Sequence, residues 1–127
     1  MTYLSKSKAS ELALEKLVKS GCTEPNSMGI IEGILDAEFS GIKSHGFHYL
    51  PIYCNHLKIG KIKGKASPRF EQISGSSIKV DADNGFAHTA INIGLKHLCK
   101  MSSVEGISCM SIYNSYNCGV LGFHTKR

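Results

Sequence analysis

The segment "GISCMSIY" (residues 106–113) is a short, nearly continuous apolar run, which predicts a buried strand over residues 107–113. Strands of this kind usually need cover on both faces of their sheet. After it come a glycine-bearing loop and the start of a helix, "NSYNCGVLGFHTKR", and no closing element. We therefore expect the chain to be the first part of a larger protein.

The first half of the chain is predicted to be mainly helical. Apolar residues recur at helical spacing in three segments, residues 6–20, 24–40 and 47–59. In the second segment, the pattern predicts an apolar stripe formed by Met28, Ile31, Leu35 and Phe39, with Ile30 and Ile34 beside it. Gly29 and Gly33 lie four positions apart, so another backbone can approach this helix closely.

The second half is predicted to contain a sheet. "RFEQI" and "SIKVDA" flank the turn-like "SGS", which predicts a β-hairpin. A helix is then expected over residues 85–101, with Asp83 or Asn84 as its cap and His88 on its outer, polar stripe. Together these elements predict an α/β fold.

Composition places the chain among soluble globular proteins. Apolar residues make up 42% and charged residues 20% of the 127 positions. No apolar run reaches the roughly 18 residues of a transmembrane helix, and the N-terminus lacks the apolar core of a secretory signal. We therefore expect a cytoplasmic protein that does not enter a membrane. Its five cysteines include no C-x-x-C pair, so we expect small buried hydrophobes rather than disulfides or a zinc site: Cys22, Cys54, Cys99, Cys109 and Cys118.

A basic cluster raises the question of nucleic-acid binding. The formal charge is +5, and four lysines lie in "KIGKIKGK" (residues 58–65). No aromatic residues interleave with them, and no known nucleic-acid-binding motif is present. We interpret the cluster as a solvated loop that at most attracts anionic substrates or a nucleotide phosphate.

The segment "KSHGFHYLP" (residues 43–51) is the main candidate for chemistry. His45 and His48, with Cys54 and His56, have a spacing that a metal site could use, but no carboxylate lies close in sequence to complete it. Nucleophilic catalysis has no sequence signature, and neither a P-loop nor a G-x-G-x-x-G turn occurs.

General acid–base chemistry remains. Histidine is suited to it because its pKa lies near neutrality. Ser44 could form a hydrogen bond to a substrate, and Gly46 could let a ligand approach the backbone. The alternative is that His45 is an ordinary surface histidine, which is common for a lone histidine in a loop.

A longer stretch, "LDAEFSGIKSHGFHYLPIYCNHLKIGKIKGKASPRF", resembles the N-terminal region of the type 2 malate/L-lactate dehydrogenase family. The shared frame is an acidic–small–Gly helix end, then S-H-G, then L-P-x-Y, then a G-x-I-x-G-x-A-x-P loop. The similarity continues through "VDADNGFAHTAINIGLKHL" and "NSYNCGVLG".

The resemblance implies a non-Rossmann α/β fold and an NAD- or NADP-dependent interconversion of small 2-hydroxy acids and 2-oxo acids. It implies that His45 gives a proton to the substrate oxygen as hydride arrives. It implies substrate contacts from Ser44, Tyr49 and Asn117, and cofactor contacts from Asn117 and Gly119. Residues 1–70 would form a substrate-side segment and residues 71–127 the beginning of the cofactor-binding domain, in a homodimer.

Two positions depart from the family pattern. Tyr49 stands where the family often has an arginine that holds the substrate carboxylate, and Asn117 stands where it has a second histidine. Neither side chain carries a positive charge. Family members are also more than twice as long. A rival hypothesis is therefore a truncated, non-catalytic remnant that acts as a binding or assembly module.

Overall fold

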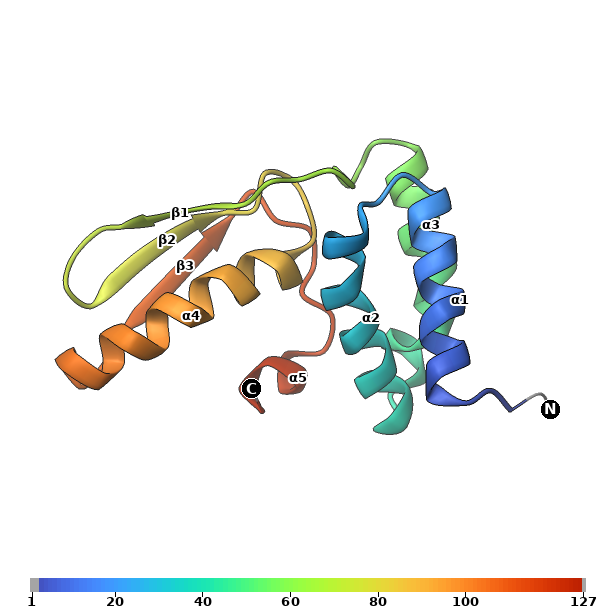
Figure 1. Ribbon diagram of the computed structural model, residues 1–127, viewed down its shortest axis with the longest axis horizontal. Helices are drawn as coiled ribbons and strands as arrows, with labels where there is room; N and C mark the ends of the chain where they lie inside the picture. The colour runs from blue at the N-terminus through green and yellow to red at the C-terminus, as the bar shows by residue number, and fades with distance from the viewer. Residues whose placement is uncertain (1–2, 127) are drawn as a thin grey trace.

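Helices fill the first half of the chain, and a small sheet with one long helix fills the second (Figure 1). The computed structural model describes residues 3–126. The helices are α1 (Lys6–Lys19), α2 (Glu24–Phe39), α3 (Leu50–Lys58), α4 (Ala87–Glu105) and α5 (Leu121–Thr125), with 3₁₀ turns η1 (Lys43–His45) and η2 (Phe47–Tyr49). The strands are β1 (Arg69–Gln72), β2 (Ser77–Asp81) and β3 (Cys109–Tyr113). The α/β class, the three early helices and the hairpin are confirmed.

Local signals set the ends of the first two helices. Ser5 caps α1 by accepting a hydrogen bond from the backbone N–H of Lys8 at 3.3 Å. Lys19 lies in the last turn of α1, where a positive charge interacts favourably with the helix dipole. Gly21 then adopts a φ of +100°, a conformation that favours glycine, and the chain turns into α2. Pro25 lies in the first turn of α2, where no intrahelical N–H donor is needed.

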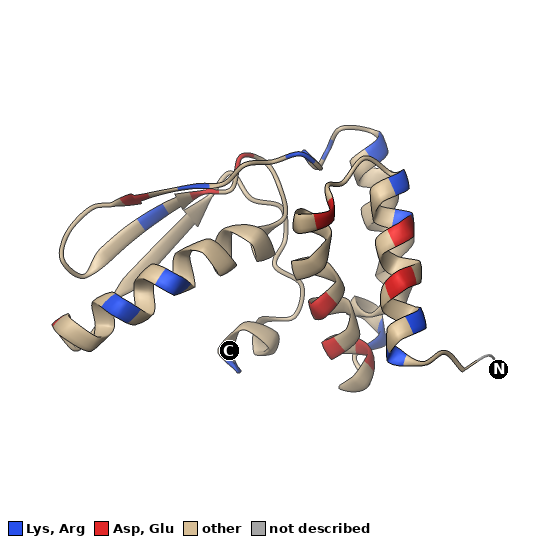
Figure 2. Ribbon diagram, viewed as in Figure 1, with Lys and Arg blue, Asp and Glu red and all other residues tan. Residues whose placement is uncertain are grey.

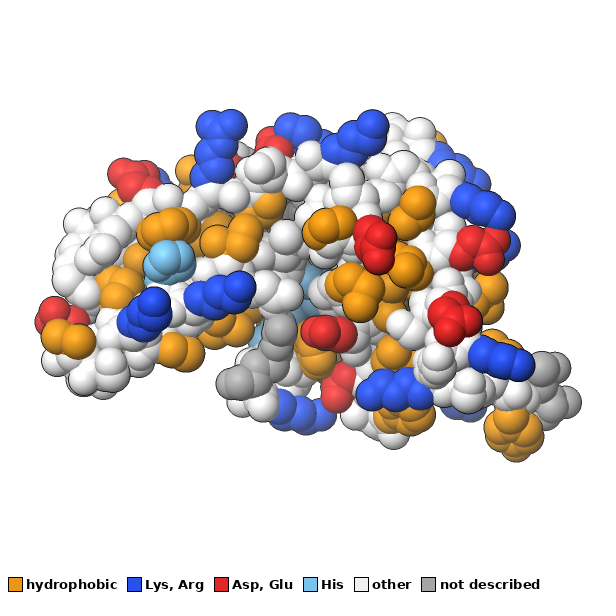
Figure 3. Space-filling model, in the orientation of Figure 1, with side chains coloured by type: hydrophobic (Ala, Val, Ile, Leu, Met, Phe, Trp, Pro, Cys, Tyr) orange, Lys and Arg blue, Asp and Glu red, His pale blue; other side chains and the backbone are white. Residues whose placement is uncertain are grey.

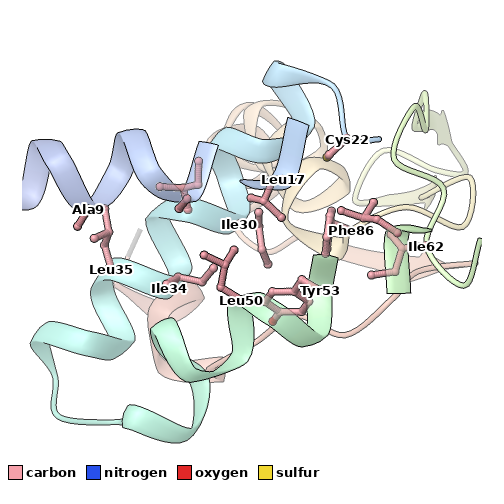
Figure 4. Close-up of a cluster of buried hydrophobic side chains, with 13 residues drawn as sticks. Ala9, Leu17, Cys22, Ile30, Ile34, Leu35, Leu50, Tyr53, Ile62 and Phe86 are labelled. Carbon is pink, nitrogen blue, oxygen red and sulfur yellow. The ribbon is translucent and has the colours of Figure 1, made fainter. Parts of the chain in front are cut away.

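The three helices bury one hydrophobic core (Figure 4). Its large members from the helices are Leu17, Ile30, Ile34, Leu50 and Tyr53. Phe86, which comes just before α4, is 2% exposed and packs in the same cluster. Phe86 therefore joins the start of α4 to the helical core, while the sheet buries a second cluster against α4.

The predicted stripe of α2 is wrong in part. Leu35 is buried, but Met28 and Phe39 are 43% and 69% exposed, and Figure 3 shows hydrophobic side chains reaching the surface over α2. Ile31 is buried as predicted, and so are Ile30 and Ile34, which were expected beside the stripe. The physical reason is that α2 packs against α1 on one side and α4 on the other, so no single stripe describes its buried surface.

The close approach predicted at Gly29 and Gly33 is confirmed, and the partner is His88 of α4. A Cβ added to Gly33 would lie 2.8 Å from Nε2 of His88, and one added to Gly29 would lie 3.1 Å from the His88 Cβ. His88 is 1% exposed, so its assignment to the outer stripe of α4 is wrong. The side chain fits between the helices because the two glycines leave room for it.

The sheet has the order β1-β2-β3 and one helical layer, α4 (Figure 1). β1 and β2 pair antiparallel, whereas β2 and β3 pair parallel with α4 as the crossover. Ile78 and Val80 of β2 face α4 and are buried. Gly94 of α4 allows this contact, because a Cβ there would overlap the sulfur of Met110.

The prediction of a buried last strand is wrong for this sheet. Cys109 and Tyr113 of β3 are exposed, and Met110 and Ile112 are half-buried on the side of α4. β3 lies at the edge of the sheet and is covered on one face only. A strand this apolar is usually covered on both faces, but the described residues cover only the face toward α4.

The start of α4 also differs from the prediction. Asp83 and Asn84 adopt φ values of +54° and +57°, and Phe86 occupies the N-cap position. The Asp83 carboxylate is instead bound to Lys63 at 2.7 Å and to the backbone N–H of Ser67 at 2.9 Å. It joins the loop before β1 to the turn after β2, so it is not available to cap the helix.

The cysteines are free thiols, but only some are shielded. Cys22 is buried and Cys54 and Cys118 are half-buried, whereas Cys99 and Cys109 are exposed, contrary to the expectation for those two. Within residues 3–126, no helix is long and apolar enough to cross a membrane.

Candidate active site

The S-H-G segment is held between α2 and α3 by a carboxylate. The Oε2 atom of Glu38 accepts a hydrogen bond from the backbone N–H of Phe47 at 3.0 Å. Gly46 is buried here, and a Cβ added to it would overlap the Glu38 carboxylate. We expected Gly46 to admit a ligand, but Glu38 occupies that side. The glycine is required by local packing.

His45 is exposed and oriented by two neighbours. Its Nδ1 atom is hydrogen-bonded to the hydroxyl of Ser44 at 3.0 Å. Its ring lies parallel to that of Tyr49, with centroids 6.1 Å apart and 5° between the planes. The residues from 3 to 126 offer no hydrogen-bonding partner to Nε2. That nitrogen can therefore exchange a proton with a bound molecule.

A row of aromatic rings leads from His45 to the C-terminal loop. Tyr49 packs edge-on against Tyr53, with centroids 4.8 Å apart. Tyr53 is 1% exposed (Figure 4), and its hydroxyl donates a hydrogen bond to Oδ1 of Asn117 at 3.2 Å. Burial, with the neighbouring Tyr49 and Tyr116, raises the pKa of Tyr53 well above its usual range. The Tyr53 hydroxyl therefore stays protonated.

Asn117 and Gly119 follow β3, at the carboxyl end of the parallel pair β2–β3, the edge where open α/β sheets usually bind ligands. The Oδ1 atom of Asn117 also accepts a hydrogen bond from the backbone N–H of Gly119 at 3.3 Å. Gly119 has a φ of +67° and faces His88, whose Nε2 atom would lie 3.4 Å from an added Cβ.

The structure brings the predicted site residues into two groups. In one group, Ser44 is hydrogen-bonded to His45 and the ring of Tyr49 lies parallel to that of His45; in the other, Asn117 and Gly119 are hydrogen-bonded to each other. The two groups meet through a residue that sequence reasoning did not select, Tyr53. Its position four residues after Tyr49, which ends η2 just before α3, was the available signal.

Tyr116 is a second residue that sequence reasoning missed. Its hydroxyl is hydrogen-bonded to Nδ1 of His56 at 2.7 Å, and the ammonium of Lys61 lies 5.9 Å from its ring centroid. Burial and the nearby Tyr49 raise the pKa of Tyr116. Tyr116 thus lies against both the phenol of Tyr53 and the imidazole of His56.

The four lysines of the basic cluster are exposed. Figure 2 shows the basic residues that follow the connection from α3 to β1. Lys63 pairs with Asp83, and Lys61 lies over Tyr116. Both lysines make these contacts at the surface, so the interpretation as a solvated loop is confirmed.

The described residues do not form the metal site that was considered as an alternative. Among residues 3–126, no group of three or more histidine, cysteine, aspartate or glutamate side chains is placed to hold a metal ion. His45 and His56 instead bond to Ser44 and Tyr116, respectively.

A cavity of about 440 Å³ lies beside Asn117, on the side of β3 that faces α4. Its lining combines apolar and polar side chains: Ala87, Ile91, Met110, Ile112, Ser115, Tyr116, Asn117 and Cys118. Apolar walls with a few placed polar groups are typical of small-molecule and cofactor sites. A larger groove of about 610 Å³ between α1 and α3 contains none of Ser44, His45, Tyr49 or Asn117 in its lining.

Known proteins with similar sequences are oxidoreductases by name. (2R)-3-sulfolactate dehydrogenase (NADP(+)) of Chromohalobacter salexigens is 32% identical over 124 residues, which cover 98% of this chain and 37% of that protein. Delta(1)-pyrroline-2-carboxylate reductase 1 of Burkholderia ambifaria is 30% identical over 118 residues, which cover 93% of this chain and 35% of that protein. The chain thus spans about a third of the length of these relatives.

Solved structures share the fold. The sulfolactate dehydrogenase from Methanocaldococcus jannaschii matches with a TM-score of 0.89 and 22% identity, covering 98% of this chain and 36% of that one. Malate dehydrogenase from Entamoeba histolytica matches with a TM-score of 0.87 and 24% identity, covering 97% and 34%. The sequence profile of the family described as malate/L-lactate dehydrogenase matches residues 4–127. The resemblance carried by the S-H-G frame is therefore confirmed, and this chain belongs to the malate/L-lactate dehydrogenase family.

Proposed function

We propose that the protein is an NAD- or NADP-dependent oxidoreductase that interconverts small 2-hydroxy acids and 2-oxo acids, with His45 as proton donor and acceptor. One observation carries the proposal: His45 is held by Ser44 and Tyr49 while its Nε2 atom remains open. Family membership and the names of the relatives support the reaction class.

The role of His45 follows from the charge that the reaction creates. When bound, the nicotinamide cofactor would supply or accept the hydride. Reduction of a carbonyl leaves negative charge on its oxygen, and a proton from Nε2 of His45 neutralises that charge. The hydrogen bond between Nδ1 of His45 and the hydroxyl of Ser44 keeps the ring from turning away. In the oxidative direction, the same nitrogen accepts the proton of the alcohol.

The substrate contacts in this proposal are neutral. Ser44 and Tyr49 supply hydroxyl groups near His45, and Asn117 supplies an amide. A hydroxyl offers one donor and cannot form the bidentate bond that a guanidinium makes with a carboxylate. We therefore propose weaker recognition of the substrate carboxylate at Tyr49 than an arginine would give.

The cofactor contacts are proposed at Asn117 and Gly119. The adjoining cavity of about 440 Å³ is lined by apolar side chains together with one amide and two hydroxyl groups. This combination fits a flat heteroaromatic ring that carries a carboxamide. These residues are too few to hold a whole dinucleotide, so the proposal covers the ring end alone.

We further propose how the chain is divided and assembled. Residues 1–70 would form the substrate side and residues 71–127 the beginning of the cofactor domain; the break between α3 and β1 supports this division. We also propose a cytoplasmic homodimer, on the strength of the resemblance, and a small-molecule partner instead of nucleic acid. The pairing of Lys63 with Asp83 supports the last point, because it removes a cation from the basic cluster.

A second candidate is a non-catalytic binding or assembly module. The observation that favours it is the neutral character of Tyr49 and Asn117. The test is oxidation of NADH and NADPH by the full-length gene product, with a panel of 2-oxo acids and cyclic imines as substrates. Turnover of about 1 per second or more with any of them supports the enzyme. No turnover with the whole panel supports the binding module.

A further inference from the structure

The amide of Asn117 is fixed in one orientation. Asparagine oxygen and nitrogen are assigned from their partners, because oxygen only accepts hydrogen bonds and nitrogen only donates them. Oδ1 receives two donors, the Tyr53 hydroxyl at 3.2 Å and the backbone N–H of Gly119 at 3.3 Å. A flipped amide would place N–H groups against the Gly119 N–H, which cannot accept. The nitrogen Nδ2 therefore points away from both.

Tyr53 cannot easily move to release the amide. Its side chain is 1% exposed and is packed edge-on between Tyr49 at 4.8 Å, Phe86 at 5.4 Å and Tyr116 at 6.1 Å, measured between ring centroids. The raised pKa of its hydroxyl keeps the donor proton in place across the pH range in which proteins are assayed. A buried, protonated phenol is a permanent donor.

The Nδ2 group of Asn117 is the part of the amide that is left to bind a ligand. Asn117 is exposed and lines the cavity of about 440 Å³. Within residues 3–126, its Nδ2 atom has no hydrogen-bond acceptor from the protein. A ligand that fills this cavity is therefore expected to place a hydrogen-bond acceptor against Nδ2.

We propose that Tyr53 is a positioning residue that fixes Asn117 as a hydrogen-bond donor, and that the ligand atom it contacts is an acceptor oxygen. The inference rests on the proposed function for the identity of the ligand. The oxygen can belong to the carboxamide of a nicotinamide ring or to the carbonyl or carboxylate of the substrate. The departure from the family histidine thus has a defined consequence, because an imidazole nitrogen can donate or accept, whereas Nδ2 of asparagine can only donate.

The test uses two near-isosteric variants of the full-length gene product. Tyr53→Phe removes the hydroxyl and keeps the ring, and Asn117→Asp replaces the donor with an acceptor of the same shape. One arm measures the affinity for NADPH and for its thionicotinamide analogue, whose sulfur is a poor acceptor. The other arm measures the affinity for oxamate in the presence of saturating cofactor.

Asn117→Asp is expected to weaken binding in one arm by about 10- to 100-fold, and Tyr53→Phe by about 3- to 10-fold in the same arm. Loss in the NADPH arm, with loss of preference over the thio-analogue, assigns the oxygen to the cofactor. Loss in the oxamate arm assigns it to the substrate. The double variant should bind no worse than Asn117→Asp alone, because Tyr53 acts through the amide. Unchanged affinity of folded Asn117→Asp in both arms would overturn the proposal. It would also be overturned if the losses of affinity from the two substitutions add in the double variant.

A stability cycle separates this inference from the proposed function. The free energies of unfolding of Tyr53→Phe, Asn117→Ala and the double variant should be non-additive, because the two residues share a hydrogen bond. If the protein binds neither cofactor nor oxamate, the proposed function fails, and a non-additive cycle still supports the positioning role of Tyr53. An additive cycle overturns that role whatever the protein binds.

Discussion

The imidazole of His45 lies parallel to the phenol ring of Tyr49, with 6.1 Å between centroids and 5° between planes. The residue that replaces the family arginine is therefore beside the proposed proton donor. Both side chains are presented by the short turns that precede α3, η1 and η2. A change at Tyr49 is thus expected to act within the site.

Tyr49→Arg should shift the substrate preference of the full-length protein toward simple 2-oxo acids such as pyruvate. A guanidinium can form two charge-assisted hydrogen bonds with the substrate carboxylate. One such charged contact is worth about 1.5–3 kcal/mol, or roughly 10- to 150-fold in relative kcat/KM. The ratio for pyruvate against an uncharged ketone of similar size measures the shift. An unchanged ratio would mean that position 49 does not face the substrate.

His45→Asn should lower kcat by about 10²–10⁴, the usual range for loss of a general acid or base. Cofactor affinity should change little, because the proposed role is proton transfer. His48→Asn is the matched control, since His48 is an exposed histidine in the adjacent turn. A larger loss for His48→Asn than for His45→Asn would contradict the assignment.

Gly46→Ala should destabilise the chain by about 1–3 kcal/mol, because its methyl group overlaps the Glu38 carboxylate. Glu38→Ala should cost about 1 kcal/mol through loss of the acceptor for the Phe47 N–H. In the double variant the overlap disappears, so its loss should be smaller than the sum of the single losses. Urea unfolding of all three variants measures this, and simple additivity would count against the contact.

Gly33→Ala should also destabilise by about 1–3 kcal/mol, because the methyl group would meet the buried ring of His88. Gly122→Ala is the control, since a Cβ there has nothing within 4 Å. Gly122 lies in α5, so alanine should be neutral or stabilise by up to about 1 kcal/mol. Thermal unfolding measures both variants, and equal losses of stability would show that contact with His88 is not the cause.

The pairing of Asp83 should give a dependence of stability on pH. The hydrogen bond from Lys63 and the backbone N–H of Ser67 hold the pKa of this carboxyl below its ordinary value of 3.8. A pKa that is lower in the folded state contributes stability above about pH 3.8, and that contribution is lost as the pH falls through the folded pKa. Asp83→Asn should therefore flatten the acid end of the stability curve. Glu71→Gln, at an exposed carboxyl on β1, is the control. The stability of this variant should still fall more steeply with decreasing pH than that of Asp83→Asn.

The elements of this fold could be predicted from sequence because their causes are local. Helical periodicity, Pro25 in the first turn of α2 and Gly21 and Gly41 after the first two helices act within a few positions along the chain. The S-H-G motif and its spacing from L-P-x-Y identified the family for the same reason. The position of His45 between two helices also followed from local sequence.

Contacts between distant residues were decided only by the tertiary structure. The bond from Tyr53 to Asn117 joins positions 64 apart, and His88 is buried only because Gly29 and Gly33 of another helix leave space for it. Periodicity predicted only part of the buried surface of α2, since a helix covered on two sides has no single apolar stripe. The sequence by itself determined which elements form and which histidine lies at the candidate site. Packing determined which side chains support that site, because it depends on partners that local patterns do not specify.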